Sequence, residues 1–181
     1  MTDLHPRITE IVADLELAHR ELVDTVMAIP AEQRDEPADD ARWSIAQNVE
    51  HLSRVEDSIG RLMSKLIAQI AASGARETDD SSLLDSLDRF GIAVPTVRVA
   101  APERSHPMEG LPTAESLQRF AVARGRMIDV LKGASGLALT TASAPHPYFG
   151  ELNVYQWGIS SAQHTRRHIH QIRAAAGLDA S

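Results

Sequence analysis

Four long segments of this chain repeat apolar residues every three to four positions, and this periodicity constrains the fold more than any other feature. The segments span residues 6–29, 44–74, 113–132 and 153–177. A spacing of i, i+3 and i+4 places apolar side chains on one face of an α-helix. No alternating pattern long enough for a sheet accompanies them. The sequence therefore predicts an all-α protein built as a four-helix bundle.

Polar residues mark where three of these helices begin. Ser44 is followed three residues later by Gln47, and Asn153 by Gln156. In such a capping box each side chain bonds the backbone N–H of the other residue, which satisfies groups that the helix leaves unpaired. Thr113 precedes the third apolar stripe and is predicted to cap it. These signals fix the expected helix starts more firmly than the helix ends.

Two connections are irregular, with several glycines and prolines. Residues 72–112 join the second helix to the third, and residues 133–152 form a loop before the fourth. A connection as long as the first is usually functional or a crossover in a compact domain. Within it we expect a short helix near residues 82–90 and an extended piece near 94–99. The length of the chain predicts one domain over residues 1–181.

The composition argues against several classes of protein. A net charge of −7 is unfavourable for binding a phosphate backbone or an anionic membrane. Cysteine is absent, which rules out a disulfide framework, a thiolate metal site and a cysteine nucleophile. No apolar run reaches the roughly eighteen residues of a membrane span, and the first residues lack a signal-peptide pattern. We expect a cytoplasmic protein with no nucleic-acid or membrane partner.

Three histidines lie on or beside the apolar faces. His164 and His168 are four residues apart, so they stack on one face of a helix, and His51 flanks the face of the second helix. If these two helices are antiparallel, the rings come to similar depth. His51 lies ~10 Å from the start of its helix, and the other two lie ~12–18 Å from the end of theirs. Three imidazoles with an open coordination position are typical of a reactive zinc-type site. The pattern predicts a divalent metal on His51, His164 and His168.

Two other interpretations of these histidines remain open. A lone histidine on an apolar face is more often a hydrogen-bonded core residue than a ligand, so a bundle without metal is possible. Alternatively, a fourth protein ligand would make the metal structural or sensory, and His19 is a candidate for it, although a core residue or one that orients a ligand is the preferred interpretation of His19. A zincin-type peptidase is disfavoured because no Glu lies between His164 and His168.

Four further residues are candidates for the surroundings of the site. Trp157 is predicted to be a core residue or the wall of a pocket. Arg167 flanks His164 on the helix and is either solvated or in contact with an anionic substrate. Arg104 and His106 lie in the long connection, where they are exposed loop residues or part of the pocket rim. His146, in the shorter loop, is expected to be solvent-exposed or a turn residue.

Several motifs resemble the DinB/YfiT-like proteins. The resemblance covers the second helix and the last 35 or so residues, and by spacing it extends over the whole chain, although residues 72–112 do not align with it. Its motifs are loose individually and fairly specific together. They are Trp43-Ser44 before His51-Leu52, then Pro145-His146-Pro147 with Gly150 and Leu152, then Trp157, and finally His164 and His168 followed by Gln171-Ile172.

The resemblance implies a bundle in up-down-down-up order, in which the second and third helices are parallel and residues 72–112 cross the length of the bundle. That order would bring the part from residue 102 to residue 112 to the mouth of the metal site, although a surface crossover that touches nothing is an equal alternative. Family members typically carry a divalent metal, here expected to be zinc or nickel, on histidines that match His51, His164 and His168. Some are S-transferases that use bacillithiol or mycothiol.

From the residues and the resemblance together we expect a metal-dependent thiol S-transferase, or a related hydrolase, that acts on a small molecule. Because the chain has no cysteine, the thiol would be an external low-molecular-weight compound. The alternative is a non-catalytic metal-binding or stress-response protein. The family's habit also implies a homodimer, with weak support from the apolar residues Ala121, Val122 and Val130, which lie off the main stripe of their helix.

Overall fold

The computed structural model describes residues 4–36, 43–94, 102–108 and 110–178. Four long helices dominate it: α1 (Pro6–Met27), α3 (Ile45–Ser73), α4 (Thr113–Gly133) and α5 (Val154–Ala175). The shorter elements are α2 (Ala31–Arg34), the 3₁₀ turns η1 (Asp88–Phe90) and η2 (Glu103–Ser105), and the strands β1 (Ser143–His146) and β2 (Gly150–Asn153). Within these ranges no helix has the length and apolar character needed to cross a membrane.

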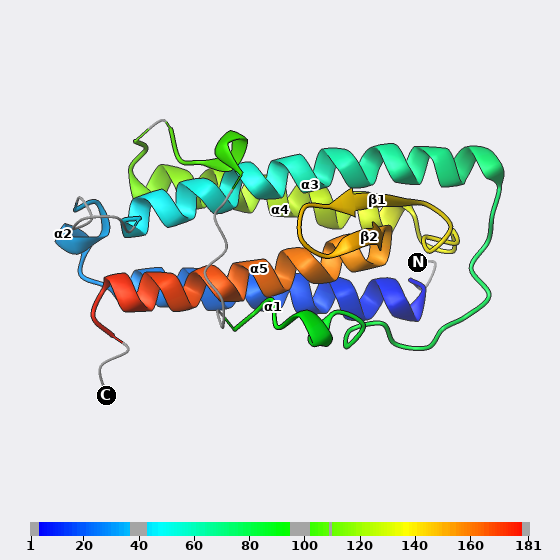
Figure 1. Ribbon diagram of the computed structural model, residues 1–181, viewed down its shortest axis with the longest axis horizontal. Helices are drawn as coiled ribbons and strands as arrows, with labels where there is room; N and C mark the ends of the chain where they lie inside the picture. Colours follow the sequence, from blue (N-terminus) through cyan, green and yellow to red (C-terminus); the bar gives the residue numbers. More distant parts are fainter. Residues whose placement is uncertain (1–3, 37–42, 95–101, 109, 179–181) are drawn as a thin grey trace.

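The long helices form the predicted four-helix bundle in up-down-down-up order (Figure 1). Helices α3 and α4 run parallel to each other and pack together most extensively, and α1 packs against α5, which runs in its direction. Helix α3 is antiparallel to α5 and in contact with it. The expected fold class is confirmed, and the antiparallel pair α3 and α5 carries all three histidines singled out by the sequence.

Both capping boxes form as predicted. Ser44 caps α3 by accepting from the Gln47 backbone N–H, and the Gln47 side chain accepts from Ser44 N. Asn153 and Gln156 do the same at α5. Two well-defined helix starts set the rotation and depth of the residues that follow, so these caps help to place the histidines of α3 and α5. At α4 the N-cap position is held by Pro112, and the predicted cap residue Thr113 is instead the first residue of the helix.

The apolar core is divided into two clusters. The larger cluster lies toward the hairpin end of the bundle and includes Ile11, Leu15 and Tyr155. The smaller cluster lies toward α2 and includes Val49 and Phe120. Buried polar residues also occupy these helices, among them His51, Glu56, Ser161, Thr165, Arg124 and His168. The interior of this bundle therefore contains a polar layer, which is unusual unless its groups are paired or functional.

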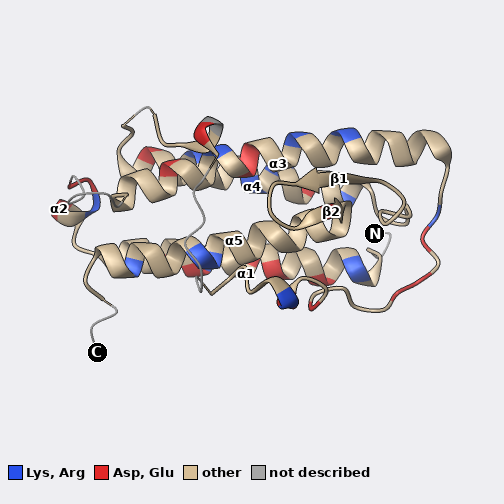
Figure 2. Ribbon diagram, in the orientation of Figure 1, with Lys and Arg blue, Asp and Glu red and all other residues tan. Residues whose placement is uncertain are grey.

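The connection that leads from the end of α3 to the start of α4 runs along the bundle, as the helix order requires (Figure 1). Its first part follows α1, where the Arg7 side chain donates to Ser81 O at 2.7 Å and Leu83 N donates to Glu10. Figure 2 shows acidic residues along this stretch. Its last part, with η2, lies against α3. The crossover thus contacts both helix pairs of the bundle.

Two local expectations need correction. The helix predicted near residues 82–90 is reduced to turns and the single 3₁₀ turn η1, and the extended piece near 94–99 lies outside the described residues after Val94. Residues 133–152, predicted to be a loop, contain all but the last residue of the antiparallel hairpin β1–β2, in which Ser143 pairs with Asn153 and His146 with Gly150. Each strand has four residues. Strands this short, one of them with a proline, give no clear alternating pattern in a sequence.

Candidate metal centre

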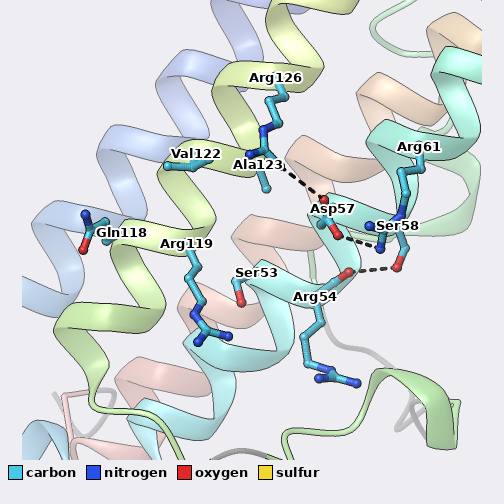
Figure 3. A pocket seen from close by; sticks show the side chains of 10 residues that line it. All are labelled: Ser53, Arg54, Asp57, Ser58, Arg61, Gln118, Arg119, Val122, Ala123 and Arg126. Carbon is cyan, nitrogen blue, oxygen red and sulfur yellow. Dashed lines mark hydrogen bonds and ion pairs between the residues drawn. The ribbon is translucent and has the colours of Figure 1, made fainter.

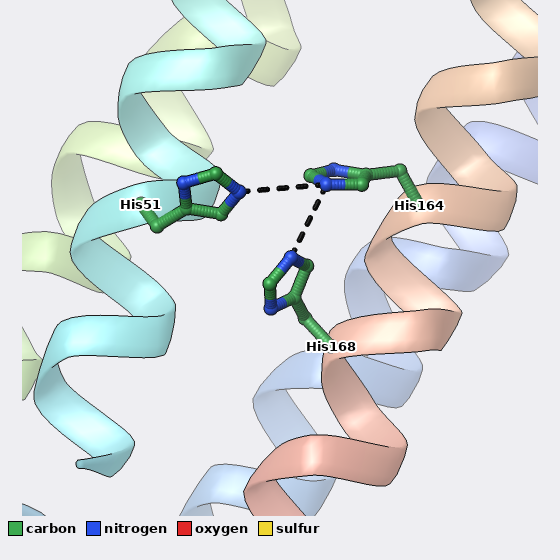
Figure 4. A group of neighbouring side chains, drawn as sticks. All are labelled: His51, His164 and His168. Carbon is green, nitrogen blue, oxygen red and sulfur yellow. Dashed lines mark hydrogen bonds between the residues drawn. The ribbon is translucent and has the colours of Figure 1, made fainter. Parts of the chain in front are cut away.

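The structure brings His51 of α3 together with His164 and His168 of α5 (Figure 4). The Nε2 atom of His164 lies 3.5 Å from that of His51 and 3.1 Å from that of His168. Nitrogen ligands at about 2.0–2.1 Å from a tetrahedral zinc ion are about 3.3–3.4 Å apart. All three ligand atoms lie within 4.8 Å of one another, so these side chains could hold one metal ion.

Hydrogen bonds at the far side of two rings fix which nitrogen carries the proton. His51 Nδ1 lies 2.7 Å from the Ser105 carbonyl oxygen, and His168 Nδ1 lies 2.9 Å from Asn48 Oδ1. The Asn48 amide nitrogen donates to Trp43 O and Ser44 O, which turns its oxygen toward His168. Both Nδ1 atoms must donate, because their partners only accept. The Nε2 lone pairs of these two rings are therefore free to bind a cation.

Burial keeps the three rings uncharged. It lowers the pKa of His51 to about 4 and that of His164 to about 3, and it lowers the pKa of His168 well below the ordinary value. For His164 and His168 the neighbouring histidines and the positive charge of Arg167 add smaller effects in the same direction. Neutral imidazole is the form that binds metals, so the site is ready to take an ion at neutral pH.

Asn48 and Ser105 contact the candidate ligands and were not predicted from the sequence. Asn48 lies three residues before His51 on α3, where a polar residue on the bundle-facing side was a usable signal. Ser105 acts through its backbone carbonyl, so its side chain gives no signal at all. Partners of this kind orient metal-binding imidazoles and raise their basicity. The segment that holds Ser105 is itself attached to α3, because Met108 N donates to Glu50 at 2.7 Å.

Trp43 forms one wall of the site. Its ring stacks on His168 with centroids 6.2 Å apart and planes 11° apart, and it lies 4.7 Å from the ring of His51. The ring of His106 meets the same tryptophan edge-on, with ring centroids 5.7 Å apart. The segment after residue 102 therefore approaches the histidines from the side of α3. The side chain of Arg104, the other candidate from this segment, lies outside the described part.

The remaining candidates do not join the ligand group within the described residues. His19 packs edge-on against Phe120 at 5.5 Å, and burial lowers its pKa. Trp157 is buried on α5 next to His146, at a ring distance of 5.1 Å. The expectation that His146 is solvent-exposed is wrong, because the residue is half-buried and its ring stacks on that of Phe149 at 4.4 Å. It is the last residue of β1, directly before the turn. Its loop is folded back onto α5 by the hairpin, which the sequence did not predict.

A second buried polar group joins the same helices. The Arg124 guanidinium pairs with both carboxylate oxygens of Glu56 and also donates to Leu15 O and Thr165 Oγ1. Ser161 Oγ donates to Glu56 at 2.6 Å. Arg124 and Glu56 are almost fully buried. This network connects α1, α3, α4 and α5, and each of its charges has an opposite charge and several hydrogen bonds.

An open groove of about 530 Å³ lies between α3 and α4. Its lining includes four arginines but none of the three histidines (Figure 3). Asp57 lies among them, 2.6 Å from Arg61 and 4.0 Å from Arg126. The groove is thus a separate surface feature, and its size does not make it the candidate site.

Comparison with known proteins agrees with this architecture. A family model described as the DinB superfamily matches residues 14–172. The solved structure of TT2238, a four-helix bundle protein, is similar to this chain with a TM-score of 0.59 and 20% sequence identity. The similarity covers 92% of this chain and 98% of TT2238. At this identity the likeness concerns the fold alone. No curated protein matches the chain.

Proposed function

The chain belongs to the DinB superfamily. On this premise we propose that it is a metal-dependent enzyme that acts on a small molecule, either by transferring a thiol to it or by hydrolysing it. His51, His164 and His168 would hold one divalent ion, with zinc or nickel favoured because both accept imidazole ligands. The observation that carries the proposal is the set of three Nε2 atoms, with two of the rings fixed as Nδ1–H tautomers.

The ligand set supports a reactive site over a closed one. Three neutral imidazoles leave the full charge of the ion uncompensated. Within the described residues, the group of side chains placed to bind the ion consists of these three histidines. His19, the candidate for a fourth ligand, is against Phe120 instead. A divalent ion with an open position supplies Lewis-acid activation of a water or a thiol. Any such thiol would come from outside, since the chain has no cysteine.

The residues around the ion have separate roles in this proposal. Ser105 and Asn48 hold His51 and His168 in their binding tautomers. Trp43 covers two of the rings and excludes water from that side. Arg167 adds positive charge near His164 and His168, which favours an anionic group at the site, such as a thiolate or a carboxylate.

Metal analysis of the full chain, purified without a histidine tag, tests the first part of the proposal. We expect about one ion per chain. A panel of alkyl and aryl electrophiles, each offered with cysteine, glutathione, bacillithiol or mycothiol, tests the second part. Turnover that depends on both the metal and one thiol identifies an S-transferase, and turnover without thiol identifies a hydrolase. A stoichiometric metal without any turnover would favour the alternative, a stress-response protein with a structural or sensory metal.

We also propose that the protein is a cytoplasmic homodimer. Val122 on α4 is 48% exposed although it is a large apolar residue, and a partner subunit would cover it. Light scattering at micromolar concentration should give twice the mass of the chain. A monomer at that concentration would contradict the proposal.

A further inference from the structure

An aromatic cluster lies where the hairpin, η1 and α5 meet. Phe90 of η1 packs against Phe149 at 4.9 Å, and Phe149 stacks on His146 with planes 17° apart. The ring of His146 lies 5.1 Å from that of Trp157. Gln163 of α5 donates to Asp88 at 3.3 Å and so joins η1 to the same helix. These contacts hold His146 and Trp157 side by side at the interior edge of the cluster.

Two ring N–H groups of this cluster are available to a ligand. Trp157 is 6% exposed, and its Nε1 atom is buried without a hydrogen-bond partner in the described part of the chain. A buried N–H without a partner is costly, so it calls for an acceptor. His146 Nδ1 accepts from Tyr148 N at 3.2 Å, which places the proton of the neutral ring on Nε2. Both neighbouring rings therefore carry one hydrogen-bond donor each.

The cluster lies next to the three histidines. Trp157 precedes His164 by seven residues on α5, which is two helical turns, or about 10 Å, along the same face. A small molecule whose reacting end is at the histidines would thus extend toward Trp157 and His146.

We propose that Trp157 Nε1–H and His146 Nε2–H bind an acceptor oxygen, carbonyl or carboxylate, of a flat and mainly apolar substrate. The inference rests on the proposed function, because the three histidines would hold the reacting end of the same molecule. Two donors side by side reject a cationic group and match an oxygen with two lone pairs. The aromatic side chains of Phe90, Phe149 and Trp157 match a flat apolar body.

Benzoate is a suitable probe, since it combines a carboxylate with a flat ring. Its affinity for the zinc-loaded full chain is measured by calorimetry for the wild type, for His146→Phe and for Trp157→Phe. Each phenylalanine keeps an aromatic ring and removes the N–H. We expect each variant to bind benzoate about tenfold more weakly, since a hydrogen bond to a charged group is lost. The exposed His170 provides the matched control, and His170→Ala should bind as the wild type does.

Zinc content is measured on every sample, which separates the two proposals. Two results would overturn the binding site at Trp157 and His146. One is equal benzoate affinity in the wild type and both variants at full zinc content, and the other is zinc-loaded wild type that binds no benzoate. Wild type that takes up no zinc would overturn the proposed function and this inference with it. Should Trp157→Phe fail to fold, as judged by circular dichroism, the His146→Phe variant decides the question, because its ring is at the edge of a turn.

Discussion

Two buried polar groups include side chains of both α3 and α5, and their hydrogen-bonding needs are satisfied in different ways. The Glu56–Arg124 network pairs opposite charges and adds hydrogen bonds from Ser161 and Thr165. The three-histidine group brings together three neutral bases whose Nε2 atoms lie 3.1 and 3.5 Å apart. Only His164 could carry a proton on Nε2, and that proton could be donated to His51 or to His168. The first group is complete within the protein, and the second needs a cation to satisfy all three nitrogens.

This contrast indicates different purposes. A complete network contributes to the stability and the arrangement of the helices. An incomplete group at the same depth leaves the native protein with unsatisfied acceptors, which is a disadvantage unless a ligand binds there. Changes to the two groups should therefore have different signatures: loss of metal for one, and loss of stability for the other.

The largest effect is expected from removing the metal ligands together. Replacing His51, His164 and His168 by Ala should reduce bound zinc from about one ion per chain to a trace, since a loss on the order of 10 kcal/mol of binding free energy is at stake. Metal content after dialysis measures this. His170→Ala, on the exposed side of α5, should retain the metal. Equal zinc in the triple variant and the wild type would contradict the assignment of the site.

Removing one partner of the buried ion pair should affect stability instead. Glu56→Ala leaves the Arg124 guanidinium buried without its counter-charge, which costs about 3–5 kcal/mol in the free energy of unfolding. Urea denaturation measures the loss. Asp57→Ala, which removes a surface partner of Arg61, should cost less than about 1 kcal/mol. A cost for Glu56→Ala as small as that control would show that the network does not stabilise the bundle.

The partner of His168 should tune the site without destroying it. Asn48→Ala removes the acceptor that fixes the His168 tautomer, and we expect metal affinity to fall by about 10–100-fold. Competition with a fluorescent zinc chelator measures the affinity. Ser58→Ala, on the exposed face of α3, provides the control and should leave the metal affinity unchanged. An unaltered affinity in Asn48→Ala would contradict this role.

The smallest effect is a dependence of stability on pH in metal-free protein. Burial lowers the pKa of His51 to about 4, below the value of about 6.5 in the unfolded chain. Below pH 6.5 the unfolded state binds the proton and the native state does not, so stability is lost as the pH falls. Between pH 6.5 and 5.5 this costs about 1 kcal/mol for His51. His51→Phe, measured by denaturation with a chelator present, should lose that much less over the same interval.

The histidines themselves were predictable because their positions follow from helical periodicity. Two of them are four residues apart on one helix, and the capping boxes at Ser44 and Asn153 set where both helices begin. The depth argument then needed only that α3 and α5 be antiparallel, as they are (Figure 1). The surroundings were less predictable. The Ser105 carbonyl reaches His51 across 54 residues, and His146 is placed by a hairpin with four-residue strands.

The sequence by itself determined the four helices, their starts, and the histidines that share the apolar faces, because these features depend on residues within one or two helical turns of each other. Only the tertiary structure decided that Arg124 faces Glu56, that Asn48 and Ser105 orient the rings, and that Trp157 and His146 lie side by side. These contacts join residues far apart in the chain. Their geometry depends on how the helices pack and on where the crossover and the hairpin fold back, which local periodicity does not specify.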